Sequence, residues 1–406
     1  MQNSHVTRRN FVKLAGLAGA ASALGAVRTF AQTTNATGAE ESRVTVGTRT
    51  FGKTGVKVSM LSLGGIFDIA SNQLVLQRAL DFGVTYWDTA NSYTNGNSEK
   101  GIGMYFEKHP EVRRKIFLVT KAGGGHAVEN VQGKLEESLR RLKTDYVDLF
   151  FLHGVGSGDA FTPEIKAWAE KMKAEKKIRF FGFSTHGNME RTLEAAAKLG
   201  WIDGIMLKYD YRLMQTDAMR SAMDACEKAG IGLTAMKTQG GGPIKTETDA
   251  DLKLGGHFVK RGFSEHQARL KAVWENPQVA AICSQMPNIT VLTANVAAAL
   301  DKTRLTAADH SALREYAAAT CSHYCDGCAH LCEGALRRRV PVADVMRSLM
   351  YHHTYGDMRL AKETFAGLPV GTRDRIATLD FSNAERACPN RLPIGQLMKQ
   401  AGELLA

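Results

Sequence analysis

The fold is decided by a stretch that reads Ile116-Phe-Leu-Val-Thr-Lys121, then Asn130–Leu142, then Tyr146-Val-Asp-Leu-Phe-Phe-Leu-His153. Its first and last parts are short apolar runs rich in β-branched and aromatic residues, which is typical of strands buried in a parallel sheet. Between them, leucines from Leu135 to Leu142 recur at the spacing of a helix that packs one face on a sheet. The stretch therefore predicts a strand–helix–strand unit.

Units of this kind repeat along most of the chain. Strands are predicted at Met60–Leu63, Thr85–Asp88, Ile116–Lys121, Tyr146–His153, Ile178–Ser184, Gly204–Tyr209, Gly232–Lys237 and Ala280–Ser284. Helices are predicted at Leu74–Phe82, Ser98–Lys108, Asn130–Leu142, Pro163–Glu175, Met189–Leu199, Asp217–Ala229, His266–Trp274 and Thr290–Leu300. Eight such units over about 240 residues match a (β/α)8 TIM barrel. A doubly wound sheet is the competing class, but its Gly-rich dinucleotide fingerprint is not found at Leu63–Phe67, after the first strand.

The sequence predicts four segments. They are a signal peptide at 1–31, a linker at 32–43, a barrel at 44–305 that opens with a β-hairpin over Val44–Ser59, and a small, mainly helical, cysteine-rich extension at 306–406. The connection from Thr238 to Ser264 is long and Gly-rich, and we expect it to cover the substrate or the cofactor.

The start of the chain has the pattern of an export signal. Thr7-Arg-Arg-Asn-Phe-Val-Lys13 precedes a short apolar stretch, Leu14–Val27, and small residues near Ala31. That order is typical of a secretory signal, and the paired arginines resemble the twin-arginine (Tat) type. An uncleaved amphipathic helix is the alternative. We expect export to the periplasm or cell envelope, with no transmembrane anchor once the signal is removed.

The composition is that of an ordinary soluble protein with a basic balance. Hydrophobic residues make up 44% of the chain, and 52 Lys and Arg against 41 Asp and Glu give a net charge of +11. Because no basic stripe is interleaved with aromatic residues, we expect no nucleic-acid partner. A positive surface that suits an anionic cofactor is the simpler interpretation.

Polar residues stand at the ends of three consecutive predicted strands. They are Asp88, Lys121 and His153, and Tyr93 follows Asp88 in the next loop. Reduction of a carbonyl builds negative charge on oxygen, which needs a proton donor. We expect Lys121 to lower the pKa of the Tyr93 phenol, Asp88 to hold Lys121, and His153 to orient the carbonyl. Taken singly, each residue also fits a structural role, such as a helix cap, a surface lysine or a core histidine.

With these residues in view, the sequence resembles the aldo-keto reductase superfamily from about Arg49 to Leu300. The opening Arg49–Ser59 resembles the hairpin of that family, and Asp88-Thr-Ala90 followed by Tyr93 resembles its signature. The resemblance implies a catalytic tetrad of Tyr93, Lys121, Asp88 and His153. It also implies a nicotinamide cofactor across the barrel mouth.

The resemblance implies cofactor contacts from Gly64, Gly65, Ser184, Thr185, Tyr209, Lys237, Ser284, Met286, Asn288 and Asn295. The chain departs from the family pattern in this set. Thr185 stands where an asparagine is usual, Met206 replaces a glutamine, and Met236 replaces a stacking aromatic residue. The arginine that pairs with a 2′-phosphate is missing, so the choice between NAD and NADP stays open.

Five of the seven cysteines cluster near the C-terminus, at Cys321, Cys325, Cys328, Cys332 and Cys388. Close spacing of this kind predicts a metal or cluster site. Cys388-Pro389 resembles the end of a ferredoxin motif, and some aldo-keto reductases carry a ferredoxin-like extension. We expect one [4Fe-4S] cluster, held by Cys325, Cys328 and Cys388 with Cys321 or Cys332 as the fourth ligand. Disulfides and a zinc site are the alternatives.

The leading prediction is an exported, NAD(P)-dependent oxidoreductase that interconverts a carbonyl and an alcohol on a small molecule, with a sugar as one candidate. The cluster would relay electrons to a redox partner or staple the tail. The rival prediction is a non-catalytic or electron-transfer iron–sulfur protein on an eroded barrel. Met206 and Thr185 favour the rival, and the intact tetrad argues against it.

Overall fold

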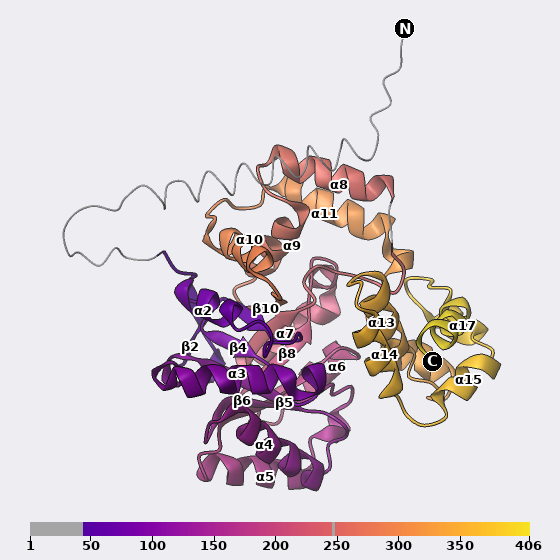
Figure 1. Ribbon diagram of the computed structural model, residues 1–406. Coiled ribbons are helices and arrows are strands. Elements are labelled where there is room, and N and C mark those ends of the chain that lie inside the picture. The colour runs from indigo at the N-terminus through magenta and orange to yellow at the C-terminus, as the bar shows by residue number, and fades with distance from the viewer. Residues whose placement is uncertain (1–43, 246–247) are drawn as a thin grey trace.

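Eight parallel strands close into a barrel in the order β10-β3-β4-β5-β6-β7-β8-β9 (Figure 1). The computed structural model describes residues 44–245 and 248–406. The strands are Leu61–Gly64 (β3), Tyr86–Asp88 (β4), Phe117–Ala122 (β5), Val147–Leu152 (β6), Ile178–Thr185 (β7), Gly204–Lys208 (β8), Gly232–Met236 (β9) and Val279–Gln285 (β10). All eight predicted strands are therefore confirmed, and so is the (β/α)8 barrel.

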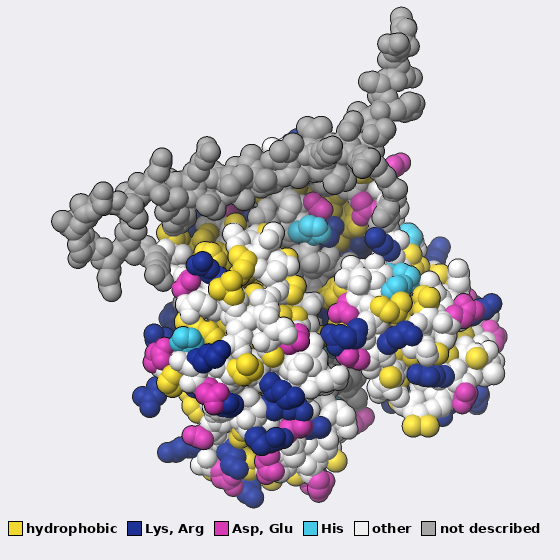
Figure 2. Space-filling model, viewed as in Figure 1, with side chains coloured by type: hydrophobic (Ala, Val, Ile, Leu, Met, Phe, Trp, Pro, Cys, Tyr) yellow, Lys and Arg dark blue, Asp and Glu magenta, His cyan; other side chains and the backbone are white. Residues whose placement is uncertain are grey.

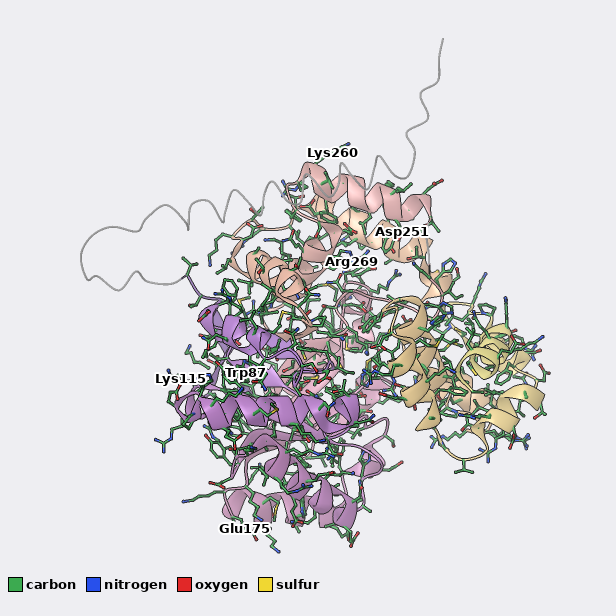
Figure 3. The ribbon with its side chains drawn as sticks, in the orientation of Figure 1. Trp87, Lys115, Glu175, Asp251, Lys260 and Arg269 are labelled. Carbon is green, nitrogen blue, oxygen red and sulfur yellow. The ribbon has the colours of Figure 1, made fainter. Side chains whose placement is uncertain are left out.

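Helices cover the outside of the barrel. They are Leu74–Asp81 (α2), Asn97–Lys108 (α3), Val128–Leu142 (α4), Pro163–Ala174 (α5), Met189–Ala197 (α6), Asp217–Lys228 (α7), Glu265–Trp274 (α9) and Ile289–Leu300 (α10). Helix α4, for example, buries one stripe against the strands, with Val131, Leu135 and Leu142 inside. Between β4 and α3, Trp87 stacks on Phe106 with ring centroids 5.8 Å apart (Figure 3). The eight predicted helices are confirmed.

The predicted N-terminal hairpin closes the bottom of the barrel. Thr48–Thr50 (β1) and Lys57–Ser59 (β2) pair antiparallel. Between them, the ring of Phe51 is fully buried and belongs to the apolar cluster that fills the barrel interior. A Cβ on Gly232 would lie 2.5 Å from this ring, so β9 needs glycine at that point.

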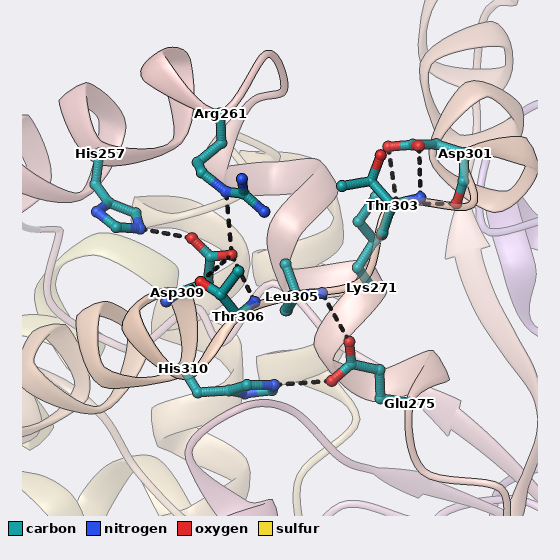
Figure 4. A network of polar contacts seen from close by, with 10 residues as sticks. All are labelled: His257, Arg261, Lys271, Glu275, Asp301, Thr303, Leu305, Thr306, Asp309 and His310. Carbon is teal, nitrogen blue, oxygen red and sulfur yellow. Dashed lines mark hydrogen bonds and ion pairs between the residues drawn. The ribbon is translucent and has the colours of Figure 1, made fainter.

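The long connection between β9 and α9 contains a further helix that the sequence did not predict, Asp249–Lys260 (α8). It packs on Ala307–Ala319 (α11), the first helix of the extension (Figure 4). The buried carboxylate of Asp309 joins the two, because it lies 2.7 Å from Nε2 of His257 and accepts a hydrogen bond from Nε of Arg261. The connection thus contains one helix, α8, which packs on the first helix of the extension.

The extension beyond the barrel, called the tail below, is helical and has its own apolar core. After α11 it comprises the short 3-10 turn Cys321–His323 (η6) and the helices Ala329–Ala335 (α12), Val342–His353 (α13), Met358–Ala366 (α14), Thr372–Thr378 (α15), Ser382–Ala387 (α16) and Ile394–Leu405 (α17). In Figure 1, α13 and α14 lie between the barrel and helices α15 and α17. The predicted helical extension is confirmed.

The predicted signal at 1–31 and linker at 32–43 lie outside the described residues. Within the part that the structure describes, no helix is long and apolar enough to span a membrane. On the face shown in Figure 2, Lys and Arg side chains are interspersed with Asp and Glu over the barrel helices.

Candidate active site

The structure brings the four predicted catalytic side chains together at the C-terminal end of the barrel. Asp88 is the last residue of β4, Lys121 lies in β5, and His153 directly follows β6. Tyr93 begins a short 3-10 turn, Tyr93–Gly96 (η2), in the loop after β4. Because these strands are neighbours in a parallel sheet, their C-terminal ends meet at one edge.

Lys121 is the centre of this group. Its Nζ donates to both carboxylate oxygens of Asp88, each at 2.6 Å, and to the carbonyl oxygen of Thr89 at 2.8 Å. The same atom lies 3.4 Å from the hydroxyl oxygen of Tyr93. Lys121 and Asp88 are only 1% and 2% exposed, so this ion pair is shielded from water.

The loop that carries Tyr93 is tied to the neighbouring strand. The backbone N–H of Thr89 donates to the carbonyl of Val119, and that of Asn91 donates to the carbonyl of Lys121. Directly after Tyr93, Thr94 has φ 48°, a left-handed conformation that a β-branched residue rarely adopts. Strain of this kind is kept only where the surrounding contacts determine the backbone, so the backbone next to Tyr93 is held in one conformation.

The pKa of Tyr93 lies well above the ordinary value for a phenol, because the side chain is buried and faces the negative charge of Asp88. The expected lowering of this pKa by Lys121 is therefore not what the structure shows. Burial is the largest cause of this rise, and Asp88 and Cys283 in β10 add to it in the same direction. Tyr93 is consequently protonated at neutral pH, which is the form that donates a proton.

The His153 imidazole faces the phenol edge-on, with ring centroids 5.8 Å apart. Burial lowers the pKa of His153 well below its usual value, and the charges of Lys121 and Arg347 lower it further. His153 is therefore a neutral hydrogen-bonding group at neutral pH. A neutral imidazole can donate to a carbonyl oxygen without delivering a proton.

The residues predicted to hold the cofactor on β7, β8 and β9 are only partly brought to the barrel mouth. Ser184 Oγ accepts from the N–H of Gly154, and Thr185 Oγ1 donates to the carbonyl of Gly187. The ring of Tyr209 points outward into the layer between strands and helices, where its hydroxyl accepts from Asn276. Tyr209 is therefore a core residue, and the prediction of a cofactor contact from its side chain is wrong.

Lys237 follows β9 and does lie at the mouth, where its Nζ donates to the hydroxyl of Tyr351 at 3.0 Å. Tyr351 belongs to α13 of the tail. The prediction for Lys237 gave the correct place in the fold but did not foresee a partner from the tail.

The predicted residues on β3 and around the start of α10 form a second set. Gly64 and Gly65 pack directly against the backbone of β10 and β4, which accounts for their lack of a side chain. The other members make local hydrogen bonds or pack in the core: Asn295 donates to Ser284 Oγ, Asn288 caps α10, and Met286 is buried.

Four of the five predicted thiols line one cavity in the tail. They are Cys325, Cys328, Cys332 and Cys388. The fifth, Cys321, is exposed in η6 and does not line the cavity. All seven cysteines are free, and within the described ranges no three His, Cys, Asp or Glu side chains converge on a point that could hold a single metal ion.

Burial raises the pKa of the cavity thiols, to about 11 for Cys325 and about 12 for Cys332. Charge on the neighbouring cysteines adds to this effect. A positively charged group between the thiols would offset both causes. Cys226 is buried in the layer between the barrel strands and the outer helices and is a core cysteine, as predicted.

Sequence reasoning missed four side chains that lie at the barrel mouth: His186, Lys208, Arg347 and Tyr351. Lys208 was detectable in principle, because strand alternation places it on the same face of β8 as Met206 in the barrel interior. Arg347 and Tyr351 come from the tail, and no sequence signal joins them to a barrel more than 100 residues away.

Comparison with known proteins identifies a family that this chain matches. A model of the Aldo/keto reductase family matches residues 43–317. The chain is 26% identical over 230 residues to the aldo-keto reductase AMT2 of Alternaria alternata, covering 46% of this chain and 62% of that protein. It is 42% identical over 114 residues to the methylglyoxal reductase YeaE of Escherichia coli, covering 27% and 37%.

The chain thus spans less than two thirds of the length of the first of these relatives. Among solved structures, it resembles the aldo-keto reductase AKR11C1 from Bacillus halodurans in its holo form, with a TM-score of 0.56 and 23% identity. That likeness covers 67% of this chain and 96% of the other, and it shows a shared fold.

Proposed function

The chain belongs to the aldo/keto reductase family, and from that premise we propose that it interconverts a carbonyl and an alcohol on a small molecule, such as a sugar, by hydride transfer with NAD(P). The family consists of NAD(P)-dependent oxidoreductases. The observation that carries the proposal is the contact of Lys121 Nζ with both the Asp88 carboxylate and the Tyr93 hydroxyl.

In this proposal each side chain has one task during reduction. A bound nicotinamide supplies the hydride. Tyr93 donates its phenolic proton to the carbonyl oxygen as negative charge grows there. Lys121 lies 3.4 Å from the phenol oxygen and stabilises the phenolate that the transfer leaves behind, while Asp88 holds Lys121 in place. His153 donates a hydrogen bond that orients the carbonyl.

The described residues offer a nicotinamide nucleotide a partial fit. Helix α10 has no acidic residue in its first turn, so its N-terminus favours an anion such as a phosphate. Ser284, Asn288 and Asn295 lie there and would hold the adenosine end. Ser184 and Thr185 would lie at the ring end. The choice between NAD and NADP stays part of the proposal.

We also propose that the tail holds one [4Fe-4S] cluster on Cys325, Cys328, Cys332 and Cys388. Support comes from the four thiols that line one cavity, which is the number of cysteine ligands that a [4Fe-4S] cluster takes. The cluster would pass single electrons to a redox partner or fix the tail. The same cavity favours the rival function, an electron-transfer protein on an inherited barrel.

Export by the twin-arginine route to the periplasm or cell envelope is a further part of the proposal. It rests on Arg8 and Arg9 ahead of the apolar stretch. Replacing both by lysine should retain the full-length chain in the cytoplasm, as fractionation of the cells would show. A variant that still reaches the periplasm at the wild-type level excludes this route.

Tyr93→Phe separates the two functions. We expect carbonyl turnover to fall by about 10²–10⁴-fold, because a general acid is lost. Tyr105→Phe is the matched control, since that phenol is on the outer helix α3 and its hydroxyl donates to Gln77. Full activity of Tyr93→Phe, with nucleotide binding intact, would leave the electron-transfer function as the better account.

The cluster is tested by the cysteines that differ in position. Anaerobically purified Cys332→Ser should lose iron and its charge-transfer absorbance, while Cys321→Ser keeps both. The reason is that Cys332 lines the cavity and Cys321 does not. Equal iron loss in the two variants, or iron-free wild-type protein, contradicts the proposal.

A further inference from the structure

A buried lysine of the barrel reaches the cysteine-rich part of the tail. Lys208 is the last residue of β8 and is 7% exposed. Its Nζ donates to the carbonyl oxygen of Cys325 and lies 4.1 Å from the centre of the Tyr324 ring. The amine of Lys208 is therefore engaged by the tail, at the first of the four cysteines that line the tail cavity.

The barrel also holds the loop that joins the first two of these cysteines. The backbone N–H of Asn188, after β7, donates to the carbonyl of Gly327 at 2.7 Å, and Asn188 Oδ1 accepts from the backbone N–H of His330 at 2.7 Å. A Cβ on Gly327 would lie 2.5 Å from the carbonyl oxygen of His186, so the loop needs glycine at this point. The cysteine loop thus packs directly on the C-terminal end of the barrel.

Cys325 stands between Lys208 and the other cavity thiols. It lines the tail cavity, and it also borders the barrel mouth, as Lys208 does. Burial raises the pKa of the Cys325 thiol to about 11, and Lys208 is the charge that opposes this rise most strongly. The contacts and the pKa agree that the ammonium group of Lys208 lies beside the tail cavity.

The charge of Lys208 has no carboxylate partner. Among the described residues, Lys208 forms no ion pair with an Asp or Glu, and its amine has a backbone carbonyl as acceptor instead. The carboxyl of Asp326 is close enough to feel this charge, but burial raises the pKa of Asp326 and so disfavours its negative form. Burying a cation without an opposite charge costs free energy. The lysine therefore indicates that an anionic group belongs in the tail cavity.

The four cysteines supply such an anion when they hold an iron–sulfur cluster. Disulfides are uncharged, whereas four thiolates outweigh the positive charge of a [4Fe-4S] core and make the filled site an anion. Reduction by one electron adds a further negative charge. A fixed cation beside the site stabilises the reduced form more than the oxidised form, and so raises the reduction potential.

We propose that Lys208 is the positioning residue of the tail cluster: it holds Cys325 in place, and its ammonium group favours the reduced state of the cluster. The inference rests on the proposed [4Fe-4S] cluster and extends it, because a residue of the barrel then sets how readily the tail accepts an electron. The step adds one electron to the cluster, and no bond forms or breaks. Asn188 shares the first task, since it holds the same loop, but it carries no charge.

The test is a redox titration of the anaerobically purified full-length protein, with dithionite as the electron donor and the EPR signal of the reduced cluster as the readout. Wild type is compared with Lys208→Met, Lys208→Arg, Asn188→Ala and Lys198→Met. Lys198 is an exposed lysine directly after α6, so Lys198→Met removes the same charge from the surface and is the matched control. Iron content, iron release to a chelator and circular dichroism are measured for each protein.

We expect the equilibrium constant for reduction to fall at least tenfold in Lys208→Met, which moves the midpoint potential by about 59 mV to more negative values. Lys208→Arg keeps the charge and should recover most of this shift, while Asn188→Ala and Lys198→Met should change the constant by less than twofold. Lys208→Met and Asn188→Ala should both release iron faster, because the cysteine loop loses one of its contacts with the barrel. If Lys208→Met retains no iron, Lys208→Gln is titrated in its place, and loss of iron from both but not from Lys208→Arg supports the need for the charge.

An equilibrium constant within twofold of wild type in Lys208→Met overturns the inference and leaves the proposed cluster in place. Equal shifts in Lys208→Met and Asn188→Ala overturn it as well, because the potential would then follow the position of the loop and not the charge. Wild-type protein without iron, or with a metal that takes up no electron, contradicts the proposed cluster itself, and the inference is lost with it. The iron content and EPR signal of wild type therefore distinguish the two failures.

Discussion

Replacing Lys121 by methionine separates the structural role of the buried ion pair from its catalytic role. The variant keeps most of the side-chain volume but removes the ammonium group. The carboxylate of Asp88, 2% exposed, then loses two hydrogen bonds of 2.6 Å and the one cation that pairs with it among the described residues. Removing one partner of a buried pair costs about 3–5 kcal/mol of the free energy of unfolding.

The cost should depend on pH in a defined direction. Burial already raises the pKa of Asp88, and Lys121 opposes that rise. Without Lys121 the folded-state pKa lies further above the unfolded value of about 3.9. The variant is therefore close to wild type in stability at low pH, and it loses stability as pH rises toward the folded pKa, by at most about 1.4 kcal/mol per unit.

Urea unfolding of both proteins at pH 5, 6, 7 and 8 measures this difference. The double variant Lys121→Met with Asp88→Asn is the control, because it removes the unpaired carboxylate. It should recover about half of the lost free energy of unfolding. Activity should stay low in both variants, since the phenolate of Tyr93 has no cation beside it. A loss under about 1 kcal/mol at pH 8, unchanged by Asp88→Asn, would refute the reasoning.

Three other predictions follow from the structure. Asp309→Ala leaves the groups that its carboxylate binds without this partner. It should lower the free energy of unfolding in urea by about 2–4 kcal/mol and speed hydrogen exchange in α8 and α11. Gly242→Ala collides with the carbonyl of His323 and should speed exchange in the tail, whereas Gly256→Ala, which meets nothing within 4 Å, should not. Since the pKa of His153 is well below its usual value, kcat/KM for reduction should stay flat from about pH 6 to 8; a fall centred near pH 6.5 would contradict its neutral state.

The barrel was predictable because each of its units carries its own signal. Apolar runs such as Val147–Leu152 have the length and composition of buried strands, and the leucines of α4 mark a helix that covers them. The catalytic group was predictable for a related reason. Residues at the ends of consecutive parallel strands must meet, so Asp88, Lys121 and His153 follow from the strand positions alone.

The features that the sequence did not predict depend on contacts between distant segments of the chain. Helix α8 has ordinary helical composition but lies in a Gly-rich connection that reads as a loop, and its partner α11 is about 50 residues away. The direction of the Tyr209 side chain follows from strand alternation, which the resemblance to a family overrode. Arg347 reaches the mouth only because the tail folds back over it.

The choice of cysteines at the tail cavity also depends on the folded structure. Spacing alone left Cys321 and Cys332 equivalent as the fourth partner. The turn at η6 places Cys321 outside, and α12 carries Cys332 into the cavity. That choice depends on the direction in which the helix leaves Cys328, which no count of residues supplies.

The central claim is that hydride reaches a carbonyl carbon while Tyr93 protonates the oxygen. The most direct measurement is a single turnover of the full-length protein with NADPH or NADH carrying deuterium at C4, followed by mass spectrometry of the alcohol product. The account predicts one deuterium on the carbinol carbon for wild type and almost no product for Tyr93→Phe, which should bind the nucleotide normally. Unlabelled product, or equal yields from the two proteins, would contradict it.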